Sequence, residues 1–114
     1  MKFNHMKRFI VFSFALLAAG AVTARGAEAK ATWAKECAKC HGVDGKGKTT
    51  MGKKLQVKDY SDPKNQADLK DEKMAKAIKE GIKEGDTTRM KAFGDMLSDS
   101  EVKALVAYFR DLKK

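Results

Sequence analysis

Apolar residues recur at helical spacing most clearly near the carboxyl end of the chain. Ser98 stands three residues ahead of Glu101, which is the pattern of a capping box and predicts that a helix begins there. The apolar positions that follow are spaced by three and four residues, which places them on one face: Val102, Leu105, Val106, Phe109 and Leu112. We therefore expect a terminal amphipathic helix.

Two further segments have weaker helical patterns. An alanine-rich stretch from Ala27 predicts a first helix that reaches about Cys40. A second helix is predicted after Asp68 or Asp71, either of which could cap it, and Gly81 suits its carboxyl-terminal cap. Its apolar stripe is narrow, with lysines on the opposite side.

The segments between these helices lack a sustained period of two or of 3.6 residues. Residues 42–55 contain four glycines, which indicates a loop that could wrap closely around another group. Residues 85–97 form a second expected loop, and no segment has the alternation of a strand. The pattern predicts an all-α domain of about three main helices joined by long loops.

The first part of the chain has the pattern of a secretory signal peptide. Three basic residues and no acidic one precede an apolar run from Phe9 to Val22. We expect residues 1–24 to be the signal peptide, with cleavage as late as 29, and residues 25–114 to form the mature domain. A run this short falls below the ~20 residues of a membrane span, so an uncleaved anchor is the weaker alternative. The mature protein is expected in the periplasm or otherwise exported, and not to be transmembrane.

Composition changes the picture of the mature domain. From Arg25 onward only about one residue in seven is Leu, Ile, Val or Phe, which is little for a self-sufficient core. The formal net charge is +9, and loss of the basic leader would leave it at about +6. A small domain of this kind needs an additional stabilising group, such as a metal or a large cofactor, since its two cysteines cannot form a multi-bridge disulfide framework.

Cys37, Cys40 and His41 form a CxxCH motif, which is the attachment signature of c-type haem. Two thiols three residues apart on a helical turn can add to the two vinyl groups of one porphyrin. The adjacent histidine can then bind the iron. A covalent haem c would also supply the missing core, so we expect Cys37 and Cys40 to bind the cofactor and His41 to ligate its iron.

Three other interpretations of the motif are weaker. A zinc site needs about four ligands, and the mature chain has no second cluster of Cys and His. A thioredoxin-like redox pair normally follows a strand in an α/β pattern, which this chain lacks. A plain disulfide suits an oxidising compartment, but it would leave the small core unexplained.

A second axial ligand would come from a methionine, because the mature chain has no second histidine. Met74 lies in the apolar stripe of the second predicted helix and is most simply a core residue. Met51 follows His41 so closely that reaching the other haem face looks difficult. Met90 and Met96 share the loop before the last helix, and packing beside that helix is the simple explanation of Met96.

Residues 27–114 resemble the small class I cytochromes c, which are exported monohaem electron carriers. The resemblance depends on Trp33, which stands four residues before the first cysteine, and on two segments, CAKCHGVDGKG and RMKAFGDMLSDSEVKALVAYFRDL. It implies the class I fold around one covalent haem c, with Met90 as the second iron ligand. It also implies that Tyr108 and Phe109 pack the last helix against the first helix and the haem. Two prolines usual in the family are missing, one after CxxCH and one at Lys91.

The resemblance implies a monomeric, non-enzymatic carrier of one electron between redox partner proteins. Lysines beside both predicted loops indicate that acidic docking surfaces are possible on these partners. The lysines are Lys39, Lys46, Lys48, Lys53, Lys54 and Lys91. Nucleic acid is not an expected partner, since no recognised binding motif is present. The alternative is an open-site haem protein that binds a gas or peroxide, if Met90 is a labile ligand.

Overall fold

A long helical segment runs from the start of the described chain to the CxxCH motif. The computed structural model describes the backbone of residues 20–113 and the side chains of residues 25–113, so most of the expected signal peptide lies outside the described residues. Helix α1 (Gly20–Thr32) continues through the π-helical turn η1 (Trp33–Cys37) into helix α2 (Ala38–His41). The predicted first helix is confirmed. The π turn directly before α2 is a local irregularity of the kind that is frequent at functional sites.

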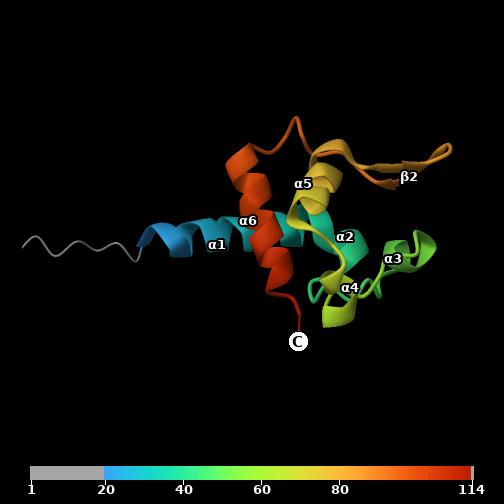
Figure 1. Cartoon of the computed structure of the whole chain (residues 1–114), viewed down its shortest axis with the longest axis horizontal. Coiled ribbons are helices and arrows are strands. Elements are labelled where there is room, and N and C mark those ends of the chain that lie inside the picture. The colour runs from blue at the N-terminus through green and yellow to red at the C-terminus, as the bar shows by residue number, and fades with distance from the viewer. Residues whose placement is uncertain (1–19, 114) are drawn as a thin grey trace, which may run out of the picture.

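The terminal helix α6 (Asp99–Arg110) crosses α1 and covers it (Figure 1). Its predicted capping box is present, because the Ser98 hydroxyl accepts a hydrogen bond from the Glu101 N–H and the Glu101 carboxylate accepts one from the Ser98 N–H. The buried face of the helix is the predicted one: Val102, Leu105, Val106 and Phe109. Leu112 lies just beyond the helix and is half-buried.

Helix α5 (Asp71–Glu80) also packs against α6, and its end at Gly81 is as predicted. Gly81 has φ +72°, a left-handed conformation that favours glycine. The predicted cap is wrong: Lys70 occupies the cap position without a side-chain hydrogen bond, and Asp71 lies in the first turn. The Asp71 carboxylate is instead paired with Arg110 of α6, so it ties the two helices together.

Two short helices lie in the part of the chain that was expected to be irregular. Helix α3 (Thr50–Lys54) is capped by the Thr49 hydroxyl, which accepts a hydrogen bond from the Gly52 N–H. Helix α4 (Pro63–Ala67) is capped by Asp62, with the proline in its first turn. Each is only five residues long, which is too short for an apolar period to be recognised in the sequence.

The expectation that no strand is present is also wrong. Strand β1 (Ile82–Glu84) pairs antiparallel with β2 (Thr87–Met90), and together they form a hairpin that projects from the helices (Figure 1). Gly85 in its turn has φ +58°. Both strands are largely exposed, so neither has the alternation of apolar and polar residues that marks a half-buried strand.

Aromatic side chains form the core where α1 and α6 cross. The Trp33 ring centroid lies 5.6 Å from that of Tyr108 and 6.3 Å from that of Phe109. Phe109 also packs against Tyr60, with 4.8 Å between the ring centroids. The expectation that Tyr108 and Phe109 pack the last helix against the first is therefore confirmed. This small cluster borders an open cavity rather than a continuous apolar interior.

Candidate functional site

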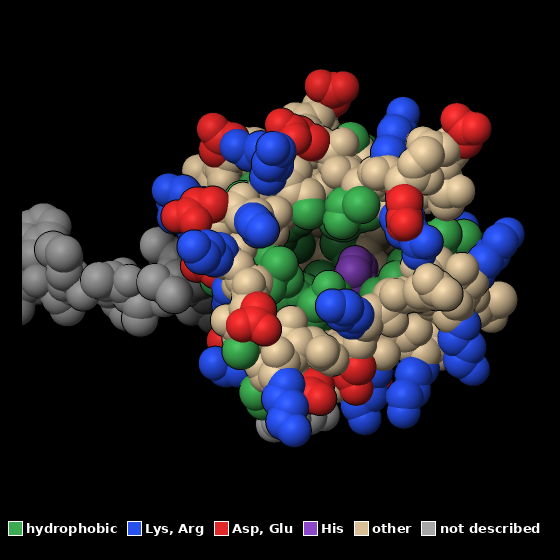
Figure 2. Space-filling model, turned by 45° about the vertical axis from the view of Figure 1, so that its right-hand side comes forward, with side chains coloured by type: hydrophobic (Ala, Val, Ile, Leu, Met, Phe, Trp, Pro, Cys, Tyr) green, Lys and Arg blue, Asp and Glu red, His purple; other side chains and the backbone are tan. Residues whose placement is uncertain are grey.

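A cavity of about 560 Å³ opens beside the CxxCH motif. Figure 2 shows the hollow, with the histidine inside it and hydrophobic side chains around it. A smaller cavity of about 130 Å³ continues toward the core and shares lining residues with the first: Cys37, His41, Tyr60, Ile82 and Met90. Together the cavities have the size of sites that hold small molecules and cofactors, which are ~300–1,000 Å³.

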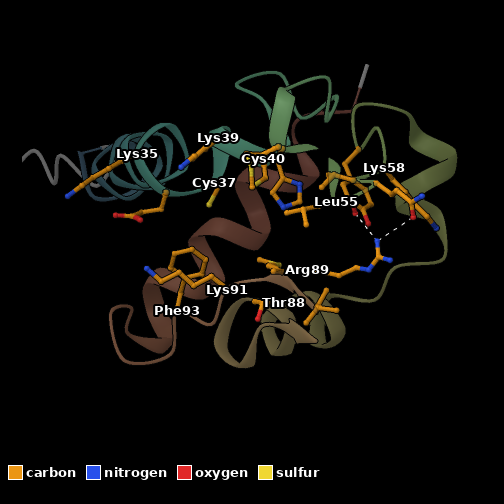
Figure 3. Close-up of a pocket in the computed structure, with 18 residues that line it drawn as sticks. Lys35, Cys37, Lys39, Cys40, Leu55, Lys58, Thr88, Arg89, Lys91 and Phe93 are labelled. Carbon is orange, nitrogen blue, oxygen red and sulfur yellow. Dashed lines mark hydrogen bonds between the residues drawn. The ribbon is translucent and has the colours of Figure 1, made fainter. Parts of the chain in front are cut away.

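The two cysteines of the motif line the larger cavity from the end of η1 and from α2 (Figure 3). Both are free and half-buried. Burial, followed by the charge of Glu36 and the neighbouring Cys40, raises the pKa of the Cys37 thiol to about 11. Burial therefore favours the neutral thiol form of Cys37. Residues 25–113 also contain no group of three potential metal ligands among His, Cys, Asp and Glu.

His41 lines both cavities at the end of α2. Burial lowers the pKa of its imidazole, so the ring is neutral at pH 7 and can bind a metal. Its Nδ1 atom is buried and has no hydrogen-bond partner among the described residues. Such an atom costs ~1–3 kcal/mol unless another group satisfies it. A buried neutral imidazole with an unsatisfied nitrogen, next to two free thiols, fits the donor set of a c-type haem.

The glycine-containing segment after the motif wraps the backbone of the motif itself. The Gly47 N–H donates to the His41 carbonyl at 2.7 Å, and the Thr49 hydroxyl donates to the Cys40 carbonyl at 2.9 Å. Gly52 packs so closely that an added Cβ would lie 2.4 Å from the Cys40 carbonyl oxygen. These contacts fix the peptide groups of Cys40 and His41, and so fix the direction of their side chains.

Trp33 fixes the other end of this segment. Its indole N–H donates a buried hydrogen bond of 3.0 Å to the Gly42 carbonyl, which directly follows the motif. The Trp33 ring centroid also lies 5.5 Å from that of His41. Trp33 therefore holds the backbone next to His41 through its indole N–H, and its ring packs near the imidazole.

Met90 is the methionine that the structure brings into both cavities. It is half-buried at the end of β2, and its neighbours Arg89 and Lys91 lie across the larger cavity from Cys37 and Cys40 in Figure 3. Met51 also lines the larger cavity, but α3 packs against α2, so Met51 comes from the same side as His41.

The other two methionines differ from each other. Met74 is 5% exposed, as expected for a core residue, and it borders only the smaller cavity. Met96 is 53% exposed and lines neither cavity, so the expectation that it packs beside the last helix is wrong. Of the two loop candidates, Met90 is the one that lines the cavities.

Basic side chains surround the mouth of the larger cavity. Four lysines and one arginine line it, against a single carboxylate, Glu36. Two of these lysines, Lys39 and Lys91, belong to the set expected from the sequence, whereas Lys46, Lys48, Lys53 and Lys54 do not line the cavity. The residues that sequence reasoning missed are Lys35, Lys58 and Arg89.

Tyr60 is a further lining residue that the sequence did not single out. Its ring centroid lies 6.0 Å from that of His41, and burial raises the pKa of its hydroxyl. Tyr60 thus contributes a neutral aromatic wall between His41 and Phe109. Nothing in the surrounding sequence distinguishes it, because its position depends on long-range packing.

Comparison with known proteins identifies the family of the chain. Residues 24–109 match the family model for cytochrome c oxidase, cbb3-type, subunit III. The chain belongs to this family of c-type cytochrome domains. Two solved structures are similar over 75% of this chain and 98% of their own. The KustC0563 c-type cytochrome is 36% identical with a TM-score of 0.68, and a tyrosine-to-phenylalanine variant of Kustc0563 is 35% identical with a TM-score of 0.65. No curated protein matches the chain significantly.

Membership of this family confirms the expected fold class and cofactor. This c-type cytochrome has the class I fold, with a small hairpin added to its helices, and carries haem c with its iron. Membership of the same family implies that this cytochrome has redox partner proteins. Within residues 20–113, none of the helices has the length and apolar character that a membrane crossing requires.

Proposed function

We propose that this c-type cytochrome is an exported electron carrier whose haem is attached through Cys37 and Cys40 and ligated by His41 and Met90. The observation that carries the proposal is the shared cavity, which brings the contiguous CxxCH motif and a distant methionine together. Export rests on the leader-like pattern of residues 1–24. The mature domain would then comprise residues 25–114 and act as a monomer.

The chain's own residues would perform distinct tasks at this site. Cys37 and Cys40 would hold the cofactor through thioether bonds, and the neutral imidazole of His41 would ligate the iron. Met90 would supply a thioether, a soft ligand that favours the ferrous state and raises the potential. When bound, haem c supplies one-electron exchange between the ferric and ferrous states of its iron. If His41 and Met90 both ligate the iron, these side chains would leave no position for a substrate, which favours a carrier over an enzyme.

Phe93, Tyr60 and Phe109 would keep water from the cofactor. Phe93 is buried beside the larger cavity, and Tyr60 and Phe109 pack together at the smaller one. A dry site limits the reorganisation that accompanies a change of charge at the iron. The exposed mouth of the cavity would then be the place where an electron enters from a reduced partner and leaves to an oxidised one.

The basic mouth of the cavity favours acidic partner surfaces. Lys35, Lys39, Lys58 and Lys91 line it, and Lys91 is held over the Phe93 ring at 5.5 Å from the ring centroid. Positive side chains around the mouth would steer an acidic partner, at a rate that falls with ionic strength. Oxidation of the reduced protein by hexacyanoferrate, an anion, should slow steeply as salt is added. A rate independent of salt would contradict this docking assignment.

An open-site haem protein is the second candidate function. The observation that favours it is the position of Met90 at the end of an exposed hairpin. The next residue is Lys91, where the class I cytochromes c that the chain resembles usually have proline. A methionine that leaves the iron would open a site for a gas or for peroxide. The presence of the weak far-red methionine-to-iron band in the ferric spectrum would contradict this candidate.

The experiment that tests the proposal compares Met90→Ala with Met96→Ala in the purified holoprotein. Met90→Ala should abolish the far-red band, lower the midpoint potential and open the iron to exogenous ligands. Met96→Ala is the matched control and should leave all three unchanged, because Met96 is exposed and lies outside both cavities. An unchanged spectrum and potential in Met90→Ala would refute Met90 as the ligand.

A haem stain on a denaturing gel tests the proposed covalent attachment of the haem. A colourless protein band would contradict that attachment.

A further inference from the structure

Arg89, which directly precedes Met90, reaches across the mouth of the larger cavity (Figure 3). Its Nη1 atom donates to the Leu55 carbonyl at 2.9 Å and lies 3.4 Å from the Gln56 side-chain oxygen. Its Nε atom lies at ion-pair distance from the Glu84 carboxylate on the neighbouring strand, without the geometry of a hydrogen bond. The guanidinium is therefore hydrogen-bonded to the turn after α3 and charge-paired with its own hairpin.

The turn at Leu55 and Gln56 belongs to the side of the cavity that carries His41. It ends α3, which packs against α2. Gln56 has φ +57°, which is uncommon for a residue other than glycine, and the Leu55 N–H and the Gln56 N–H are bonded back to carbonyls of α3. The acceptor of the Arg89 hydrogen bond is thus part of a defined turn.

The hairpin has few other links to that side. Beyond it, the Phe93 and Gly94 N–H groups bond to α5. Among residues 25–113, the hydrogen bonds that connect residues 82–90 with residues 37–60 are both donated by Arg89. Arg89 is therefore the polar connection between the side that carries Met90 and the side that carries His41.

We propose that Arg89 is a positioning residue for Met90: by tying the hairpin to the Leu55–Gln56 turn, it determines how readily Met90 leaves the iron. The inference rests on the proposed ligation by Met90. A thioether is a weak ligand for ferric iron, so its retention depends on how firmly the protein holds it in place. Without Arg89, the end of the hairpin could separate from the Leu55–Gln56 turn. An external ligand could then take the place of Met90.

The test is a titration of the ferric holoprotein with imidazole, in which the loss of the far-red band measures how much imidazole has bound. Arg89→Gln should raise the apparent imidazole affinity about tenfold, the scale of a charge-assisted hydrogen bond discounted for partial exposure. Arg89→Lys keeps the charge without the forked geometry and should give an intermediate value. Lys83→Gln is the matched control, since it removes one positive charge from the same exposed hairpin and should change the affinity less than about twofold.

Two further measurements separate positioning from other roles. If Arg89 only stabilises the fold, Arg89→Gln will lower the unfolding midpoint and leave the imidazole affinity at the Lys83→Gln value, which would overturn the proposal. If Arg89 instead pairs with a carboxylate of the bound cofactor, the pH dependence of the midpoint potential will change without a change in that affinity, which would overturn it as well. Glu84→Gln removes only the partner that orients the guanidinium, so it should raise the affinity by a smaller factor even if Arg89→Gln fails to fold.

The same measurements distinguish a failure of the proposed Met90 ligation from a failure of the proposed positioning by Arg89. A wild-type protein without the far-red band would refute ligation by Met90, and with it any positioning by Arg89. A wild-type protein that has the band, together with an Arg89→Gln variant that binds imidazole as the control does, would refute the positioning alone.

Discussion

The tightest contact at the CxxCH motif gives a prediction for Gly52→Ala. A Cβ at this position would lie 2.3 Å from the Gly47 carbonyl oxygen and 2.4 Å from the Cys40 carbonyl oxygen, both well under the 3.0 Å that real contacts of this kind respect. Both neighbours are backbone atoms, so no side chain can swing away. The substitution must push the loop from the motif and disturb the Thr49 hydrogen bond to Cys40.

The expected cost follows from the rigidity of these neighbours. Overpacking a well-packed site costs ~1–3 kcal/mol, and we expect the upper end, ~3 kcal/mol, because only backbone can move. With a denaturant slope of ~3 kcal/mol per M for a domain of this size in guanidinium chloride, the unfolding midpoint should fall by ~1 M. The yield of covalently attached haem should fall too, because the substitution displaces the carbonyl of Cys40, a proposed attachment residue.

Guanidinium unfolding of the purified holoproteins, followed by far-ultraviolet circular dichroism, measures this shift. Gly85→Ala is the matched control, because its φ of +58° disfavours a side chain while nothing lies within 4 Å of the added Cβ. It should cost only the ~1 kcal/mol of a left-handed residue. A Gly52→Ala midpoint no lower than that of Gly85→Ala would refute the argument that the loop is locked against the motif.

Three further substitutions test the core and the last helix. Trp33→Phe removes the buried donor to the Gly42 carbonyl and should cost ~1–2 kcal/mol in guanidinium unfolding; an unchanged midpoint would contradict the role of that bond. Phe109→Ala empties the helix crossing and should cost ~3–5 kcal/mol, so a thermal unfolding transition close to wild type would be inconsistent with it. Hydrogen bonds from the Ser98 backbone and then its side chain hold the pKa of the Glu101 carboxyl below its usual value. Its contribution is present above the usual pKa of ~4.3 and is lost as pH falls through the lowered value, so Glu101→Gln should be less stable than wild type at pH 7 and equal near pH ~2; a difference that persists in acid would contradict this.

The elements that the sequence predicted correctly are those whose determinants are local. The last helix has its cap, its first-turn acid and its apolar stripe within residues 98–112, and the structure has each of them. The CxxCH motif is likewise contiguous, so the sequence alone could single out Cys37, Cys40 and His41, and the structure has all three in the lining of one cavity. The shortage of large aliphatic residues correctly pointed to a cofactor, because a helical domain must fill its interior with something.

The elements that the sequence missed depend on distant contacts. The hairpin is short and exposed on both faces, so no period marks it, and Arg89 reaches 34 residues back to Leu55. Helix α4 is fixed to the core by Gln66, whose amide donates to the Phe109 carbonyl 43 residues away. Among 24 basic residues, nothing local distinguishes Arg89 from a solvated charge.

Met90 shows how the two kinds of information combine. Spacing along the chain left Met90 and Met96 open, and the family resemblance favoured Met90. The structure adds that Met90 lines both cavities whereas Met96 is largely exposed. The choice depends on the path of the chain after Gly81, which includes the hairpin that the sequence did not reveal.

The most direct test of the account is the near-infrared magnetic circular dichroism of the purified ferric protein. The position of the porphyrin-to-iron charge-transfer band depends on the pair of axial ligands. Ligation by His41 and Met90 predicts the band of a low-spin histidine–methionine haem, which should disappear in Met90→Ala and persist in Met96→Ala. A band typical of histidine with an amine, or a high-spin spectrum with water on the iron, would contradict the account.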